Sequence, residues 1–487
     1  MEKIKSIIQK CPTLIIFITC IIFSLIFGNI NENIENDYGI TIIIVGFFIL
    51  FSIFIVLDKL KLIKGEHIKY FIFSFIFIIY IGYIINTNCA TRQHDTRSLD
   101  WENGGHFGYI NYILENKKLP DFNPTTKWCF SNPPLFYILS AIFVKIQNLF
   151  GRQGYQAIEN LQYLTVFFTM SFLAYTYKIL ELLEIKKMKN FLILFIGLSP
   201  TIVYLSGSLN NDVLSIFLLV IAIYYTIKWY KQSKFKDLIV IALSISLAMM
   251  TKINSAIIAI PIAIVFLIKL IKEKQYIKKY ILYYFVFALI ALPIGLWFPV
   301  KNLIKYNVPI TYIQTVAEGK ENSGYIGQKG LINRIFTADK EHLKTLNLKF
   351  EKGKSDYNIF LTTLKSFMVD EQIDYSSSLI LKIALYGMFG INIIFLVFFI
   401  ISIFENKISI ELIFLYLILV FEILFYINFC INYPYAFTMN FRYIVPTIIV
   451  LGVGLGQLAE KNNKIKNVVQ NLIILYTLFS VILFINI

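Results

Sequence analysis

The residues best suited to chemistry lie in one short hydrophilic stretch that follows an early apolar block. Three carboxylates and two histidines fall within thirteen residues, and these are His94, Asp95, Asp100, Glu102 and His106. A carboxylate that faces a pocket at a membrane surface can take a proton from a hydroxyl group. A solvated acidic loop is the plain alternative for such a run of charge.

Aromatic residues among these charges favour a site over a solvated loop. Trp101 and Phe107 interleave with the carboxylates, and Tyr109 and Tyr112 follow at helical spacing. Large apolar side chains suit a pocket wall, and functional residues often lie on loops that a rigid scaffold positions. The sequence therefore predicts that this stretch docks against another part of the protein.

Two isolated basic residues form a second candidate group. Lys252 lies in a tight turn between apolar blocks, and Arg442 is followed by Tyr443 near the C-terminus. Each cation could simply snorkel to the membrane surface. Together they could bind a phosphate group at that surface.

Two further polar features fall at or within apolar blocks. Asn210, Asn211 and Asp212 open one block, where a plain helix N-cap is the alternative to a binding role. Glu422 lies inside another block, and an ionisable residue within a membrane is a functional candidate by default. A structural pair with another helix would account for Glu422 equally well.

The composition requires that these candidates be positioned by membrane helices. Of the 487 residues, 57% are hydrophobic and 15% are charged, against about 25% charged in a soluble protein. Uncharged blocks such as 14–27 and 71–85 recur along the chain, and each span needs roughly 20 apolar residues. We predict an all-α polytopic membrane protein with about thirteen transmembrane helices, at 12–28, 39–57, 69–87, 159–182, 190–207, 211–230, 236–251, 253–271, 280–299, 379–404, 408–431, 441–459 and 466–486.

The net charge of +15 is best interpreted as a topology signal rather than as a nucleic-acid-binding surface. Lysines concentrate in short loops, including 58–69, 186–189 and 269–279, and such loops face the cytoplasm. This places the N-terminus in the cytoplasm. The two long hydrophilic stretches, 88–158 and 300–378, then fall outside.

One apolar segment, 133–150, is not counted as a span. It is short and polar in places, and counting it would place the lysines of 186–189 outside. We predict an amphipathic helix in the outer interface. Pro133 and Pro134 can start this helix because proline is tolerated in a first turn.

The cysteines and histidines show no metal-site spacing. Cys89 and Cys129 fall near one membrane face, where a disulfide between them is one alternative. The candidate residues require no metal and no other cofactor.

The order of these motifs resembles the GT-C superfamily of integral membrane glycosyltransferases. The closer resemblance is to the branch that contains protein O-mannosyltransferases and the aminoarabinose transferase of lipid A. It covers about residues 70–460, with amphipathic helices expected at 103–116 and 133–150. One departure is Asn132, which stands before the double proline where family members often carry His or Lys. Another is the presence of two additional spans before the one that leads into the acidic loop.

The resemblance implies transfer of a sugar from a polyprenyl-phosphate carrier to an acceptor hydroxyl on the extracytoplasmic face. A carboxylate would be the base in an inverting reaction, with Asp95 the first candidate, Glu102 the second and Asp100 also in the group. Lys252 and Arg442 would hold the carrier phosphate. The other candidate substrate-binding residues are His94, His106, Tyr109, Asn132, Asn211, Asp212 and Tyr443.

We therefore expect an enzyme in a bacterial or archaeal plasma membrane. Its partners would be the lipid-linked sugar donor, membrane lipid and a glycan, lipid or protein acceptor, and not nucleic acid. A lipid or polysaccharide transporter or flippase is the main alternative, which predicts broken helices and ionisable residues along a path through the bilayer. A non-catalytic member of the same fold is the third.

The chain divides into four expected parts. N-terminal spans occupy 1–69, and the catalytic transmembrane module occupies 70–299 with the outer loop 88–158. An extracytoplasmic loop follows at 300–378, and C-terminal transmembrane helices fill 379–487.

Overall fold

The computed structural model describes residues 12–28, 38–90, 96, 98–314, 324–350, 354–369 and 378–486. Within these residues, helices are joined by turns and loops, and an isolated antiparallel bridge pairs Tyr325 with Tyr435. The prediction of an all-α protein is confirmed.

Three apolar helices open the described chain, and shorter helices fill the first long hydrophilic stretch. α3 and α4 approach closely at Gly39, where a Cβ atom would lie 2.2 Å from the Gly82 carbonyl oxygen. The Gly39 N–H also donates to Asn86 Oδ1 at 2.8 Å. The elements are α2 (Pro12–Phe27), α3 (Tyr38–Lys59), η2 (Gly65–His67), α4 (Ile68–Asn86), η3 (Trp101–Asn103), α5 (Gly105–Asn116), η4 (Pro124–Thr126), α6 (Leu135–Leu149) and α7 (Gly154–Glu159).

The central part of the chain forms a bundle in which α11 packs between α8 and α12. α14 extends past the predicted end of its span at residue 299 and continues to Tyr306, with Pro293 and Pro299 inside it. The elements are α8 (Leu161–Leu182), α9 (Lys189–Gly197), α10 (Pro200–Gly207), α11 (Asn211–Gln232), α12 (Phe235–Met249), η5 (Ile253–Ile258), α13 (Ala259–Lys272), η6 (Lys274–Tyr276) and α14 (Ile277–Tyr306).

The second hydrophilic stretch docks onto the bundle before the last long helices. Lys365 is fully buried, and its Nζ donates to Asp356 Oδ1 at 2.9 Å. The Thr201 hydroxyl of α10 donates to the Phe367 carbonyl oxygen at 2.9 Å. The elements are α15 (Leu331–Phe336), α16 (Lys340–Lys344), α17 (Ile359–Ser366), α18 (Leu379–Glu405), α19 (Ile410–Asn432), η8 (Ala436–Thr438), η9 (Phe441–Ile444), α20 (Thr447–Lys461) and α21 (Asn463–Ile485).

The prediction of thirteen spans is wrong. In the described part of the chain, eight helices are long and apolar enough to cross a membrane, or ten if each of two bent helix pairs is one span. α2 and α12 have only 16 and 15 residues, which is short of the roughly 20 that a span needs. α8 is long enough, but polar side chains such as Gln162 and Lys178 interrupt it. The bent pairs are α9 with α10, at 59°, and the 436–444 segment with α20, at 53°.

The two helices expected in the first hydrophilic stretch are present as α5 and α6. α6 starts at Leu135, directly after the double proline, and its 15 residues are too few to cross a membrane alone. Its location in the membrane interface stays a prediction. Cys89 and Cys129 are not joined by a disulfide, and burial raises the pKa of the Cys89 thiol well above its usual range.

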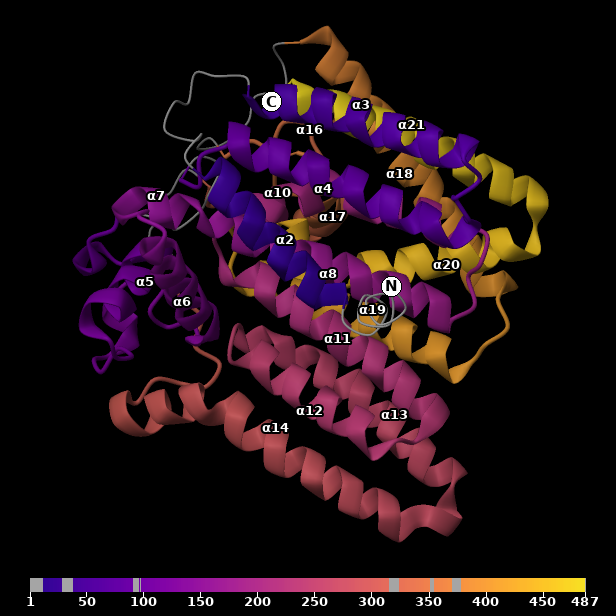
Figure 1. The fold of residues 1–487 in the computed structure, drawn as a ribbon. Coiled ribbons are helices and arrows are strands. Elements are labelled where there is room, and N and C mark those ends of the chain that lie inside the picture. The colour runs from indigo at the N-terminus through magenta and orange to yellow at the C-terminus, as the bar shows by residue number, and fades with distance from the viewer. Residues whose placement is uncertain are drawn as a thin grey trace.

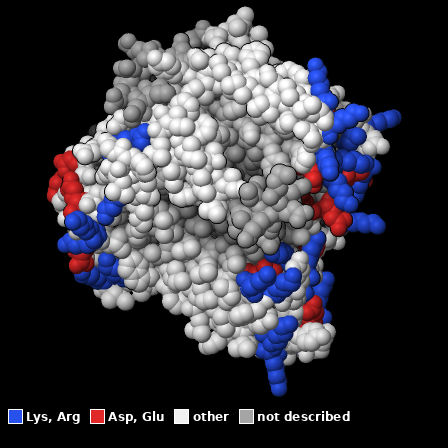
Figure 2. Space-filling view, viewed as in Figure 1, with Lys and Arg blue, Asp and Glu red and all other residues white. Residues whose placement is uncertain are grey.

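On one face of the molecule, the charged side chains of the described residues gather mainly at two edges. Figure 1 shows α5, α6 and α7 grouped at one end of the bundle, with α14 along one side against α12. In the same view, Figure 2 shows charged side chains at two opposite edges, with a broad face almost free of charge between them. Charged groups are costly inside a bilayer, so this pattern fits a membrane belt between two wet faces.

Candidate active site

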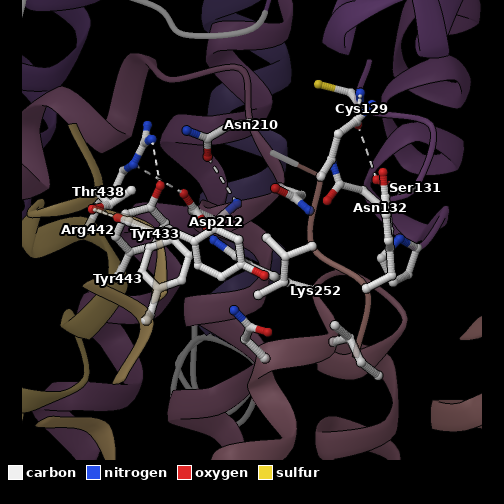
Figure 3. Close-up of a pocket in the computed structure, with 18 of the residues that line it drawn as sticks. Cys129, Ser131, Asn132, Asn210, Asp212, Lys252, Tyr433, Thr438, Arg442 and Tyr443 are labelled. Atoms are coloured by element: carbon white, nitrogen blue, oxygen red, sulfur yellow. Dashed lines mark hydrogen bonds and ion pairs between the residues drawn. The ribbon is translucent and has the colours of Figure 1, made fainter. Parts of the chain in front are cut away.

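A buried carboxylate and two cations form the centre of the site. Asp212 lies in the first turn of α11, where Asn210 caps the helix by accepting from the Asp212 N–H at 3.0 Å. Asp212 is 6% exposed. Lys252 lies at the start of η5, and its Nζ pairs with Asp212 Oδ1. Arg442 lies on η9, and its Nε is 3.9 Å from Asp212 Oδ2. Three residues far apart in the sequence therefore converge, as Figure 3 shows.

An aromatic ring supports both cations. The centroid of the Tyr443 ring lies 4.7 Å from Lys252 Nζ and 5.0 Å from Arg442 Cζ. Arg442 Nη2 also donates to the Tyr443 hydroxyl at 3.0 Å. Cation–π attraction favours this arrangement. Because two cations face one carboxylate, the cluster carries an excess of positive charge that suits an anion such as phosphate.

The opposite wall of the site comes from α5 and the turn before α6. His106 Nδ1 lies 2.9 Å from the Tyr137 hydroxyl, which also accepts from Asn132 Nδ2 at 3.2 Å. The Tyr109 ring stacks between Phe130 and Tyr137, with centroid distances of 4.5 and 4.0 Å. Burial raises the pKa of Tyr109, so its phenol stays protonated. This stack fixes α5 against α6 and thereby positions His106 and Asn132.

A glycine pair allows the 127–132 loop to approach α5. Gly104 has a φ of 70°, and a Cβ atom there would lie 2.7 Å from the Trp128 backbone nitrogen. The Gly105 N–H donates to the Trp128 carbonyl oxygen at 2.8 Å. Glycine adopts this backbone conformation without steric cost. The two glycines of the acidic stretch therefore bring Trp128 to the cavity wall.

Gln314 ties the second hydrophilic stretch to the same loop. Its Oε1 accepts from the Cys129 N–H at 2.9 Å and from the Ser131 hydroxyl at 3.2 Å. Its Nε2 donates to the Lys127 carbonyl oxygen at 3.2 Å. Gln314 was not a sequence candidate, since a single glutamine in a long loop carries no recognisable signal.

These walls enclose a polar cavity with a volume of about 340 Å³. Amide, hydroxyl and aromatic side chains dominate its lining, which is a surface suited to sugar hydroxyls and ring faces. We call it the polar cavity. It is lined by His106, Trp128, Cys129, Ser131, Asn132, Pro133, Asn210, Asn211, Asp212, Lys252, Ile253, Asn254, Tyr312, Ile313, Gln314, Phe429, Tyr433, Tyr435, Phe437, Thr438, Arg442 and Tyr443.

A second, mainly apolar cavity of about 620 Å³ shares the charged cluster with the first. We call it the apolar cavity. Asp212, Lys252, Arg442 and Tyr443 line both cavities. From this junction the apolar cavity extends between α11, η5, α13, α14 and α19. Its apolar lining includes Ile216, Leu219, Met249, Ile257, Ile260, Leu296 and Phe425, and Glu422 also faces it.

The first-loop carboxylates do not join this cluster within the described residues. Asp100 Oδ1 accepts from the Glu102 N–H at 3.0 Å and so caps η3. Glu102 Oε2 pairs with Lys127 Nζ at 2.5 Å, and its side chain is 60% exposed. Neither residue lines either cavity. Asp95 and His94 lie outside the described residues.

Most of the predicted substrate-binding residues do come together. The polar cavity is lined by the predicted residues His106, Asn132, Asn211, Asp212, Lys252, Arg442 and Tyr443. Tyr109 lies behind the wall. Sequence reasoning missed Trp128, Gln314, Tyr433 and Tyr435, although the two tyrosines follow a predicted span and precede Arg442, which is a detectable signal.

Comparison with protein families gives a match to part of the chain. Residues 131–297 match the family model described as dolichyl-phosphate-mannose-protein mannosyltransferase. This part of the chain is therefore similar to the membrane glycosyltransferases of that family. A comparison of the chain with curated proteins gives no match.

The matched segment covers part of the site. It contains Asn132, Asp212 and Lys252, begins after the acidic stretch and ends before Arg442. The resemblance seen in the sequence is confirmed.

Proposed function

We propose that the protein transfers a sugar from a polyprenyl-phosphate carrier to an acceptor hydroxyl on the extracytoplasmic side of the membrane. One observation carries this proposal: an apolar cavity and a polar cavity meet at Lys252 and Arg442. The donor has three parts that match this arrangement. Its lipid chain suits the apolar cavity, its phosphate suits the two cations, and its sugar suits the polar cavity.

The donor matches the cavities part by part. The polyprenyl chain occupies the apolar cavity among α11, α13, α14 and α19, and its phosphate lies against Lys252 and Arg442. The sugar then enters the polar cavity, where Trp128 and Tyr433 offer ring faces and Asn132 offers an amide. Aromatic faces and a few placed polar groups are the usual means of orienting a small ligand.

The reaction is a single displacement at the anomeric carbon. Asp95 accepts the proton of the acceptor hydroxyl as the oxygen attacks, and the bond from the anomeric carbon to the phosphate oxygen breaks. The polyprenyl phosphate leaves with one more negative charge than it had in the donor. Lys252 and Arg442 stabilise that charge, because fixed cations in a partly dry site need no reorganisation during the reaction. Asp212 positions both cations.

The orientation in the membrane is inferred from charge. Lysine-rich short loops indicate the cytoplasmic face. The polar cavity lies at the other ends of the helices, beside the first long hydrophilic stretch. The acceptor is therefore met outside, and it is a glycan, a lipid or a protein with a free hydroxyl.

A transfer assay tests the proposed function. Purified protein is mixed with polyprenyl-phosphate-linked radiolabelled mannose and membranes of a strain that lacks the protein. We expect label to move from the donor to acid-stable membrane glycoconjugates, and the Lys252→Gln/Arg442→Gln double variant to give background transfer. Equal transfer by the double variant would contradict the proposed phosphate site.

Filling the apolar cavity with a larger side chain should raise the KM for donors with long carrier chains more than for donors with short ones. Leu296 on α14 lines the apolar cavity, so Leu296→Trp is expected to raise the KM for a long-chain donor about tenfold. A donor with a ten-carbon chain should be affected much less, because it reaches less of the cavity. The measurement is KM against carrier length.

The matched control lies one turn away on the same helix. Leu292 is 57% exposed and does not line the apolar cavity. Leu292→Trp should leave the KM for both donors near that of the wild type. Equal effects of the two tryptophans, or no dependence on chain length, would show that the carrier chain lies elsewhere.

A further inference from the structure

The last turn of α17 holds the short element that carries Arg442. The Ser366 hydroxyl oxygen accepts a hydrogen bond from the Phe441 N–H at 2.9 Å. The Phe367 and Phe441 rings pack edge to face, with their centroids 4.6 Å apart. Phe441 opens η9 and directly precedes Arg442. Two contacts therefore join the second hydrophilic stretch to the backbone beside Arg442.

η9 depends on such contacts because it is too short to fix its own position. It has four residues, and η8, which precedes it, has three. A short 3₁₀ turn has poor hydrogen-bond geometry and usually acts as a connector rather than as a rigid element. The position of the Arg442 side chain is therefore set by what the backbone of η9 packs against.

α10 holds the same end of α17. The Thr201 hydroxyl donates to the Ser366 and Phe367 carbonyl oxygens, both at 2.9 Å. Thr201 and Ser366 are each 4% exposed, so these hydrogen bonds are shielded from water. α10 leads into the turn that opens α11, which carries Asp212. The end of α17 therefore contacts both the element before Asp212 and the element that carries Arg442.

A buried ion pair fixes α17 one residue before Ser366. Lys365 Nζ donates to Asp356 Oδ1 at 2.9 Å, and neither residue is more than 1% exposed. Lys365 Nζ also donates to the Asn347 carbonyl oxygen at 3.3 Å. His342 Nδ1 lies 3.5 Å from Asp356 Oδ1. Because breaking a buried ion pair is strongly destabilising, α17 is a fixed support against which η9 can be held.

We propose that Ser366 is a positioning residue for the carrier phosphate site. Through the Phe441 N–H it holds η9 so that Arg442 lies beside Lys252 before the donor arrives. Cations that are fixed in advance need no reorganisation when charge develops on the phosphate. Ser366 lines neither the polar cavity nor the apolar cavity, so it acts through Arg442 and does not touch the donor. This inference rests on the proposed function and gives the second hydrophilic stretch a role in it.

Binding of the released carrier tests the proposal without relying on sugar transfer. The probe is a polyprenyl phosphate of eleven isoprene units, and its dissociation constant is measured with the full-length protein in detergent. Ser366→Ala should weaken binding about threefold to tenfold, because one buried hydrogen bond contributes roughly this much. Arg442→Gln should weaken binding more, because the phosphate then loses a charged partner.

Combining Ser366→Ala with changes to the two cations separates positioning from a general structural effect. In Arg442→Gln protein, Ser366→Ala should cause no further loss of binding, because the residue that it positions is already gone. In Lys252→Gln protein, Ser366→Ala should weaken binding by the same factor as it does in the wild type. A general structural effect of Ser366 would weaken binding in both proteins.

Two further variants complete the test. Phe367→Leu weakens the second contact with Phe441 and should show the same dependence on Arg442. Ser402, in the last turns of α18, is fully buried, and its hydroxyl donates to the Phe399 carbonyl oxygen at 2.6 Å. Ser402→Ala should therefore bind the probe as the wild type does. Thermal unfolding without the probe shows that each variant is folded.

Two results would overturn the positioning role alone. One is a further loss of binding when Ser366→Ala is added to Arg442→Gln. The other is unchanged binding in both of the folded Ser366→Ala and Phe367→Leu proteins. Unchanged binding in Arg442→Gln protein itself would overturn the proposed phosphate site together with this inference, so the two kinds of failure are distinguishable.

Discussion

Replacing Asp95 by Asn is expected to lower kcat for sugar transfer by about 10²–10⁴-fold, with little change in the KM for the donor. An amide of the same shape cannot accept the proton of the attacking hydroxyl, and a positioned base contributes about this much. A loss in kcat without a loss in KM indicates an interaction made in the transition state. The measurement is initial transfer rates in detergent-solubilised membranes at saturating donor.

The other carboxylates of the stretch supply matched controls. Asp100 caps η3, and the exposed Glu102 side chain pairs with half-buried Lys127. An ion pair open to solvent contributes only about 0–1 kcal/mol. Asp100→Asn and Glu102→Gln should therefore change kcat by less than about fivefold. Near-normal transfer by Asp95→Asn would exclude Asp95 as the base, and a large loss in Glu102→Gln would assign the base to Glu102.

The helical fold could be predicted from the sequence because many long apolar blocks in one chain almost always form membrane helices. The number of spans could not be predicted from the sequence. α2 and α12 are as apolar as spans but have only 16 and 15 residues. Apolarity alone does not reveal where a helix ends, because a helix terminus depends on caps and on packing against neighbours.

The charged residues of the site could be predicted from their unusual position in the sequence. Lys252 and Arg442 are conspicuous because the short loops on their side of the membrane carry few other basic residues. From the sequence, their shared partner Asp212 is either a binding residue or part of a plain helix N-cap. The structure shows that Asn210 caps the turn, while the Asp212 carboxylate pairs with both cations. Such a convergence depends on tertiary packing, which no local pattern encodes.

The polar lining from the second hydrophilic stretch could not be predicted. Gln314 and Tyr312 are ordinary loop residues by type and spacing. Their role follows from the path of the chain after α14, which returns over the 127–132 loop. The sequence therefore indicates the charges of a site more readily than the amide and aromatic groups that shape it.

Replacing Lys252 or Arg442 by Gln is expected to lower kcat/KM for transfer by about 10²–10³-fold each. The leaving phosphate gains a negative charge in the transition state, and loss of one fixed donor for such a charge typically has this effect. The measurement is kcat/KM with donors of long and short carrier chains. Both donors should lose activity equally, because the phosphate is common to them.

Stability could confound this result, since Lys252 also pairs with a buried carboxylate. Asp212 is 6% exposed, and removing one partner of a buried pair costs about 3–5 kcal/mol. The nearby Arg442 should keep the loss at the lower end of that range. A fall in transfer by Lys252→Gln alone therefore does not distinguish a phosphate ligand from a structural partner.

The double variant Asp212→Asn/Lys252→Gln resolves the two roles. It removes the buried carboxylate together with its lysine partner, so the unfolding temperature should return most of the way to that of the wild type. Transfer should stay low, because the phosphate still lacks Lys252. If transfer returned together with stability, Lys252 would be only the partner of Asp212.

Assays of protein variants with long and short carriers also test the orientation in which the donor binds. Leu296→Trp should discriminate between carrier lengths and Lys252→Gln should not, because one lies in the apolar cavity and the other at its junction with the polar cavity. If the donor bound the other way round, with its sugar in the apolar cavity, Leu296→Trp would weaken long and short donors alike. The two variants together therefore test the orientation of the donor, which neither tests alone.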